Sequence, residues 1–198
     1  MMADRPKYFD IRQDLWTQHW DMAQSYDAYL SASPADKADK WRNHPIVPIA
    51  DDVRDRLAGY GREMNVLVSS GIWCGDCARQ GPMFRQIADA CGDKVSLRFI
   101  DRDASESLRD ELQVVGAMRV PMVLFLTEDF HEIGRFGDRT LSVYRRKAER
   151  EMGAACSTGL FGPPEEELIE EQNEWIDIFE RMLLMARLAP ALRARHGD

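Results

Sequence analysis

The chain has 198 residues, of which 44% are hydrophobic and 30% are charged, and its formal net charge is −8. This length fits one domain of ordinary size, and this composition argues against a fully disordered or collagen-like chain. The excess of acidic residues opposes binding to a phosphate backbone, so we expect no nucleic-acid partner.

We expect no export signal in the first residues. Residues 1–7 are charged and interrupted by a proline, and no apolar stretch follows them. Apolar runs such as 120–126 are far shorter than the roughly 20 residues of a membrane helix. We therefore expect no membrane partner and a cytoplasmic location. In such a compartment, a close pair among only four cysteines indicates catalysis or metal binding rather than a disulfide scaffold.

The first third of the chain has the pattern of helices. Apolar residues at steps of three and four predict one long amphipathic helix over 9–30. Ser33, as an N-cap, and Pro34, at the first helical position, predict a second helix that runs to about Arg42. A third helix, with apolar positions four apart, ends before Gly59.

The middle of the chain alternates between short apolar strands and helices. The predicted elements are a strand over 65–69, a helix around 83–88, a strand over 95–100, a helix over 108–115, strands over 122–126 and 133–136, and a helix over 141–150. The predicted order is therefore β-α-β-α-β-β-α.

The last part of the chain combines a glycine-rich loop with a long helix. An apolar stripe predicts a helix over 165–189 that packs on the core, because its large side chains cannot remain in water. We divide the chain into an N-terminal helical extension (1–62), a central domain of alternating strands and helices (63–152) and a loop with a C-terminal helix (153–198), all in one folded unit.

The sequence Trp-Cys-Gly-Asp-Cys at residues 73–77 follows a predicted strand and opens a predicted helix. A thiolate at a helix N-terminus is stabilised by unpaired N–H groups, and a cysteine three residues later can reach back to form a disulfide. Cys74 would attack a substrate and Cys77 would resolve the intermediate. A structural zinc site needs four ligands and the chain offers no second pair, so we expect redox chemistry without a metal or other cofactor.

This segment resembles the thioredoxin superfamily over residues 65–150. Pro82 stands where that family carries the proline of the active-site helix, Val120 and Pro121 stand at its cis-proline loop, and Gly137 stands at its glycine after the hairpin. The resemblance implies a thioredoxin-like three-layer α/β/α sandwich with a mixed central sheet, here with an N-terminal helical extension and a long C-terminal helix. The bond between Val120 and Pro121 is predicted to be cis.

Within the superfamily, the chain is similar to bacterial thioredoxin-like proteins with helical extensions. The similarity lies in the motif at 73–77 and in residues 100–103 and 132–137. It implies a thiol-disulfide oxidoreductase, a cytoplasmic reductant of protein disulfides, that acts on a disulfide-containing protein or small molecule and is recycled by another reductant. The alternative is a protein-interaction module whose cysteine pair is a redox switch.

The implied site has three groups of residues. The catalytic residues are Cys74 and Cys77, the substrate-binding residues are Trp73, Val120 and Pro121, and the tuning residues are Gly75, Asp76 and Pro82.

Three positions depart from the thioredoxin pattern. Val68 occupies the position of the buried aspartate that helps move a proton to and from the resolving thiol, so proton transfer needs another route. Asp76 lies between the cysteines, where its charge would disfavour the Cys74 thiolate and favour a reducing potential, with Arg79 as a partial offset. Met122 replaces the usual threonine after the cis-proline.

The other reactive side chains are not assigned to a site. Cys91 is interpreted as a semi-buried free thiol, with an accessory redox role as the alternative. Cys156 is either an inert loop thiol or a second resolving cysteine. We expect His19 to be packed rather than to bind a metal, and His44 is likewise not assigned. A homodimer through the terminal helices is left open.

Overall fold

The computed structural model describes residues 8–152 and 165–197. Its centre is a mixed four-stranded sheet of order β2-β1-β3-β4. The strands are β1 (Met64–Ser70), β2 (Val95–Asp101), β3 (Met122–Thr127) and β4 (Glu132–Gly137). Strands β1 and β2 are parallel, whereas β3 is antiparallel to both β1 and β4. The predicted α/β fold, with helices on both faces of a mixed sheet, is confirmed.

Alternation along the buried strands divides the core into two layers. In β1, Val66 and Val68 join one apolar cluster and Leu67 joins the other, because successive side chains of a strand point to opposite faces. Both faces of the sheet are covered, which explains why the side chains of β1 and β3 are almost all buried.

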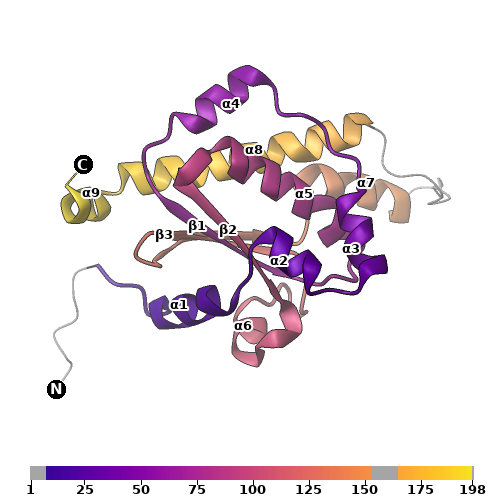
Figure 1. The fold of residues 1–198 in the computed structure, drawn as a ribbon, viewed down its shortest axis with the longest axis horizontal. Helices are drawn as coiled ribbons and strands as arrows, with labels where there is room; N and C mark the ends of the chain where they lie inside the picture. The colour runs from indigo at the N-terminus through magenta and orange to yellow at the C-terminus, as the bar shows by residue number, and fades with distance from the viewer. Residues whose placement is uncertain (1–7, 153–164, 198) are drawn as a thin grey trace.

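Helices of different parts of the chain cover the two faces (Figure 1). The first face packs against α2 (Tyr26–Ser31), α3 (Ala35–Arg42), α4 (Asp51–Ala58), α5 (Gly75–Ala90) and α8 (Glu165–Leu188). The second face packs against α1 (Gln13–Met22) and α6 (Glu106–Glu111). Helix α7 (Leu141–Met152) lies against α8, and α9 (Pro190–His196) ends the described chain. Two short 3₁₀ turns, Gly92–Lys94 and Arg102–Ala104, flank β2.

The predicted C-terminal helix is confirmed as α8, and its apolar stripe lies in the core. Trp175 and Phe179 are fully buried. The ring of Trp175 meets Phe84 edge to face at a centroid distance of 4.6 Å, and Phe179 meets Phe125 of β3 in the same way at 5.1 Å. Helix α8 is therefore part of the main core. No helix in the described ranges is long and apolar enough to cross a membrane.

The prediction of one long helix over 9–30 is wrong. The chain leaves helical geometry at Ala23, and Gln24 pairs with Phe99 of β2 through two backbone hydrogen bonds of 2.8 and 2.7 Å. Ser25 then caps α2 by accepting a hydrogen bond from the backbone N–H of Ala28. This break positions Tyr29 of α2 over the sheet, where its ring stacks on Phe99 of β2 at a centroid distance of 5.8 Å.

Two smaller predictions about helix ends are also wrong. Helix α6 ends at Glu111, and Val115, predicted as part of its apolar face, is fully exposed with a φ of 52° in a turn closed by Val114 and Ala117. At α3, the N-cap is Pro34 rather than Ser33, and no side chain caps the helix.

Candidate redox-active site

The cysteine pair lies where β1 passes into α5. Cys74 is the N-cap of α5, with extended backbone angles of −81° and 127°, and Cys77 lies in the first helical turn. Cys74 is partly exposed, whereas only 1% of Cys77 is exposed. Both thiols are free in this structure. One thiol is therefore open to a substrate, and the other is enclosed behind it.

Packing against Trp41 of α3 supports the segment before the pair. The indole Nε1 of Trp41 donates a hydrogen bond of 3.1 Å to the carbonyl oxygen of Ile72. Its ring lies so close to Gly81 that a Cβ there would come within 2.3 Å of it. Pro82 follows inside α5, where it removes one helical hydrogen bond. The N-terminal extension thus holds both ends of the cysteine segment.

The loop before β3 faces the pair, and the peptide bond between Val120 and Pro121 is cis, as predicted. The Cys74 thiol donates to the carbonyl oxygen of Val120, with 3.7 Å between sulfur and oxygen. A Cβ on Gly137 would lie 2.5 Å from the carbonyl oxygen of Pro121, so only glycine fits beside this loop. The bond after Gly137 is also cis. Distant segments therefore meet at the exposed thiol.

The pKa values of the two thiols are shifted in opposite directions. A hydrogen bond from the Cys77 thiol, helped by the backbone N–H groups of Cys77 and Asp76, lowers the pKa of Cys74 to about 6, against burial and the Asp76 charge. Burial and the neighbouring Cys74 raise the pKa of Cys77 far above its ordinary value. Cys74 is thus largely a thiolate at neutral pH, while Cys77 keeps its proton.

Asp76 acts on the acidity of Cys74 in the direction predicted from the sequence, and Arg79 pairs with it as predicted. The charge of Asp76 does raise the pKa of Cys74, but the hydrogen bond from Cys77 outweighs it. The Asp76 carboxylate also binds two guanidinium groups, with N–O distances of 2.9 Å to Arg79 and 2.5 Å to Arg139. Asp76 therefore shifts the pKa of Cys74 in the predicted direction, but it is not the largest influence on that thiol.

These ion pairs belong to a larger network beside the site. Arg79 also pairs with Glu171, a carboxylate of α8 that is 1% exposed, at 2.8 Å. Arg139 also pairs with Asp138 at 2.8 Å, and the buried Asp138 accepts a hydrogen bond from the phenol of Tyr144. The sequence did not indicate Arg139, which lies 63 positions from Asp76.

We expect Asp76→Asn to lower the pKa of Cys74 further, by less than about one unit, because the substitution removes one negative charge that is only a minor influence on this thiol. The shift is measured from thiolate absorbance against pH. Asp52→Asn, on the exposed surface of α4, is the control and should leave the pKa unchanged. A pKa of Cys74 that rises in Asp76→Asn would contradict this account.

The remaining residues named from the sequence lie around the exposed thiol. Trp73 is 54% exposed, and its ring lies under the guanidinium of Arg102 at 5.0 Å from the centroid. Gly75 opens α5, and a Cβ there would meet no other atom within 4 Å, so space does not require this glycine. Met122 is buried in β3. Trp73 therefore offers the open apolar surface beside Cys74.

Cys91 and His19, which the sequence did not assign to a site, are both buried. Cys91 is 1% exposed, and burial raises its pKa to about 12, so it is an unreactive thiol. His19 is fully buried, and its ring nitrogens hydrogen-bond to the Leu15 carbonyl and the Ser105 hydroxyl. The prediction of a packed histidine is confirmed. Cys156 lies outside the described residues.

Within residues 8–152 and 165–197, no three His, Cys, Asp or Glu side chains are grouped to hold a metal ion. A groove of about 700 Å³ lies near His131, Met185 and Leu192, at the far end of β3 from Pro121. It is remote from the thiols.

The mixed sheet and its flanking helices are those of a thioredoxin-like α/β protein. A thioredoxin family model matches residues 23–149, which is well over half of the chain, and the chain belongs to this family. The match begins before β1, so it includes α2, α3 and α4 of the helical extension.

Two solved structures share most of the fold. A Pseudomonas aeruginosa protein of unknown function is 18% identical, with 87% of this chain and 96% of that chain covered and a TM-score of 0.63. An HIV epitope-scaffold is 19% identical, with 84% and 98% covered and a TM-score of 0.59. No functionally curated protein matches the chain. At these identities, the structural likeness shows the fold alone.

Proposed function

We propose that this chain is a thiol-disulfide oxidoreductase that acts as a reductant, of the bacterial thioredoxin-like type with helical extensions, in the cytoplasm. The observation that carries the proposal is the unequal pair: a partly exposed thiol with a pKa of about 6 beside a buried thiol whose pKa is raised. Such inequality separates an attacking cysteine from a resolving one.

In the proposed reaction, the Cys74 thiolate attacks one sulfur of a substrate disulfide. That S–S bond breaks, one substrate thiolate leaves, and a mixed disulfide forms between Cys74 and the substrate. Cys77 then loses its proton and attacks the Cys74 sulfur. The second substrate thiolate leaves as the bond between Cys74 and Cys77 closes. The substrate gains two electrons, and another reductant restores the dithiol.

The direction of the reaction rests on the acidity of Cys74. Its pKa of about 6 is nearer to the value of about 7 in thioredoxin than to the value of about 3.5 in the strong oxidant DsbA. A less stabilised thiolate favours the disulfide form and makes the dithiol a better reductant. The substrate would lie on Trp73 and pair with the backbone beside Val120, and it is a disulfide-containing protein or small molecule.

Reduction of insulin in the presence of dithiothreitol tests the proposal. The wild-type chain should accelerate precipitation of the insulin B chain, while Cys74→Ser should match dithiothreitol alone. If the wild-type disulfide forms and opens reversibly but no turnover occurs, the pair is the redox switch of an interaction module instead.

A further inference from the structure

Two segments of the chain flank the open thiol, and the proposed reaction, on which this inference rests, needs a substrate disulfide to be held between them. One segment ends in Trp73, directly before Cys74, and the other is the loop at 118–121. The carbonyl oxygen of Val120 in that loop lies 3.7 Å from the Cys74 sulfur, although the two residues are 46 positions apart. Strand β1 ends at Ser70 and β3 begins at residue 122, so both segments lie outside the strands. Their spacing therefore depends on contacts of their own.

One side chain, that of Arg102, contacts both segments. Its guanidinium carbon lies over the ring of Trp73, 5.0 Å from the ring centroid. Its Nη1 donates a hydrogen bond of 3.1 Å to the carbonyl oxygen of Met118, two residues before Val120. Arg102 itself comes from the 3₁₀ turn after β2, so it belongs to neither segment. A third part of the chain thus links the two sides of the site.

The guanidinium of Arg102 is fixed by its own neighbours. Its Nε and Nη2 donate to the two carboxylate oxygens of Asp103, at 3.3 and 3.2 Å. The Asp101 carboxylate caps the turn by accepting a hydrogen bond of 2.8 Å from the backbone N–H of Asp103. A planar guanidinium can donate in several directions within its plane while its face lies on an aromatic ring. The sequence at 100–103 therefore supports one arginine that makes three contacts at once.

The ring of Trp73 is held on a second side by Gly71. A Cβ on Gly71 would lie 2.8 Å from this ring, so the indole packs directly on the glycine. Gly71 and Arg102 together fix the orientation of the ring, and the side chain is still 54% exposed. Trp73 is thus a fixed apolar surface beside the open thiol.

We propose that Arg102 is a positioning residue for polypeptide substrates. It holds Trp73 and the loop at 118–121 at the spacing that a peptide segment needs for its disulfide to reach Cys74. A peptide chain on both sides of the disulfide contacts both segments, so it gains from their fixed spacing. A small disulfide reaches the Cys74 sulfur without using both. Arg102 breaks and forms no bond itself, and the proposal narrows the substrate to a disulfide within a polypeptide.

The test compares two uncharged disulfides, so that the loss of one positive charge does not alter the approach of the substrate. One is a peptide disulfide without charged side chains, and the other is bis(2-hydroxyethyl) disulfide. Both react with the reduced chain in the Cys77→Ser background, where the mixed disulfide accumulates, and intact mass gives the rate of its formation. Arg102→Ala should lower the rate constant for the peptide about tenfold, because it removes a cation–π contact and a hydrogen bond that fix the two segments. The rate constant for the small disulfide should keep its wild-type value.

Arg102→Lys separates the charge from the geometry. An ammonium group keeps the positive charge near the Trp73 ring but has no planar fork, so it cannot hold the ring, the Met118 carbonyl and Asp103 together. Its rate constant for the peptide should therefore lie between those of the wild-type side chain and Arg102→Ala. A full return to the wild-type rate would mean that charge alone is needed, which would contradict the proposal.

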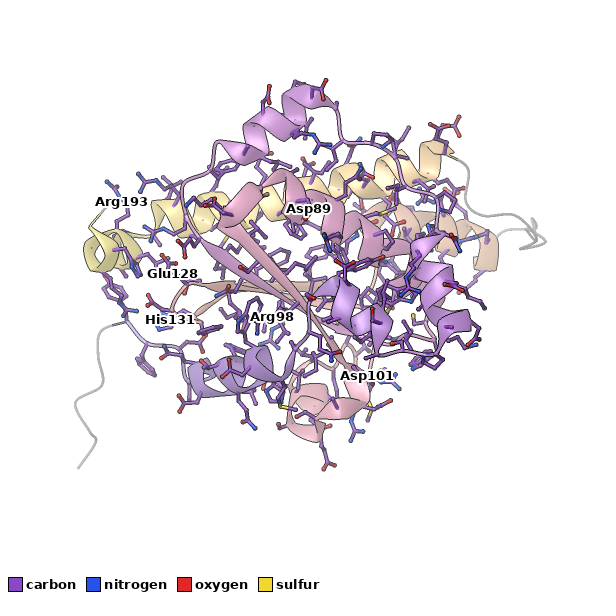
Figure 2. All side chains as sticks on the ribbon, in the orientation of Figure 1. Asp89, Arg98, Asp101, Glu128, His131 and Arg193 are labelled. Carbon is purple, nitrogen blue, oxygen red and sulfur yellow. The ribbon has the colours of Figure 1, made fainter. Side chains whose placement is uncertain are left out.

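Arg98→Ala is the matched control. The guanidinium of Arg98 lies over the ring of Trp20 at 4.7 Å and donates a hydrogen bond of 3.0 Å to the Trp20 carbonyl oxygen, so it makes the same two kinds of contact. Figure 2 shows Arg98 within β2 beside α1, whereas Asp101 marks the end of the strand near α6. Arg98→Ala should therefore leave both rate constants unchanged.

Each outcome has a separate meaning. If the Cys77→Ser chain forms no mixed disulfide with either probe, the proposed function fails. If it reacts with both probes, and folded Arg102→Ala either keeps the peptide rate or loses both rates equally, the positioning role is wrong while the function stands. If Arg102→Ala fails to fold, the ratio of the two rates in Arg102→Lys decides, since the proposal requires that ratio to fall below the wild-type value.

Discussion

Cys74→Ser is expected to abolish disulfide reduction, whereas Cys77→Ser should accumulate a stable mixed disulfide with the substrate. The reason is positional: Cys74 is the open thiol with a pKa of about 6, and Cys77 is enclosed and protonated. A serine hydroxyl at position 74 cannot form a disulfide, and without the second thiol the first intermediate has no internal route to resolution. Mass spectrometry of the intact variants after exposure to a peptide disulfide gives the answer.

Cys91→Ala is the matched control, because Cys91 is a buried thiol outside the pair. It should keep wild-type turnover. A mixed disulfide that forms on Cys77 in the Cys74→Ser variant, at the rate seen for Cys74 in Cys77→Ser, would reverse the assignment of roles.

Phe179→Ala should reduce the free energy of unfolding by about 3–5 kcal/mol, which is the usual cost of removing a fully buried phenylalanine. In a chain of this size, that loss lowers the melting temperature by roughly 6–20 °C. Phe179 packs between Phe84 of α5 and Phe125 of β3, so the effect reports on the docking of α8. Urea unfolding and thermal melting measure it.

Leu184→Ala is the control on the same helix, because Leu184 is 41% exposed and should cost no more than about 1 kcal/mol. If Phe179→Ala kept wild-type stability, α8 would be an appendage rather than part of the core. The inclusion of 153–198 in one folded unit with 63–152 would then be wrong.

The local features of the active segment could be predicted from the sequence. A short apolar run, the pair Cys74 and Cys77, and a helical pattern follow one another within about 25 residues, so neighbours in the chain determine most of the local structure. The change of hydrophobic period distinguished strands from helices, because β1 and β3 are buried on both faces.

The break in the N-terminal helix could not be predicted, because its cause lies far away in the chain. The periodic apolar positions of 9–30 fit a continuous helix, but Gln24 pairs with Phe99, 75 positions later, and this pairing supplies the backbone hydrogen bonds that the helix would otherwise make. Tertiary contacts commonly override local preference in this way. Because of this break, the ring of Tyr29 stacks on Phe99 at a centroid distance of 5.8 Å, and no sequence pattern indicated that contact.

The electrostatics of the site were predicted in part. The sequence identified Asp76 and its neighbour Arg79, which lie one helical turn apart and do pair. Arg139 and Glu171 come from the segment after β4 and from α8, so only the fold brings them to the site. The direction of the Asp76 effect on Cys74 could therefore be predicted, whereas its second partner, Arg139, could not.

Selective alkylation of the reduced native chain tests the central claim most directly. Iodoacetamide is added at a series of pH values, and peptide mass spectrometry gives the rate at each cysteine. We expect Cys74 to react far faster than Cys77, with a rate that rises through a pH of about 6 and is constant above it, because the thiolate is the reactive form. Equal rates at Cys74 and Cys77, or a Cys74 rate that rises only above pH 8, would contradict the account of an activated thiol beside an enclosed one.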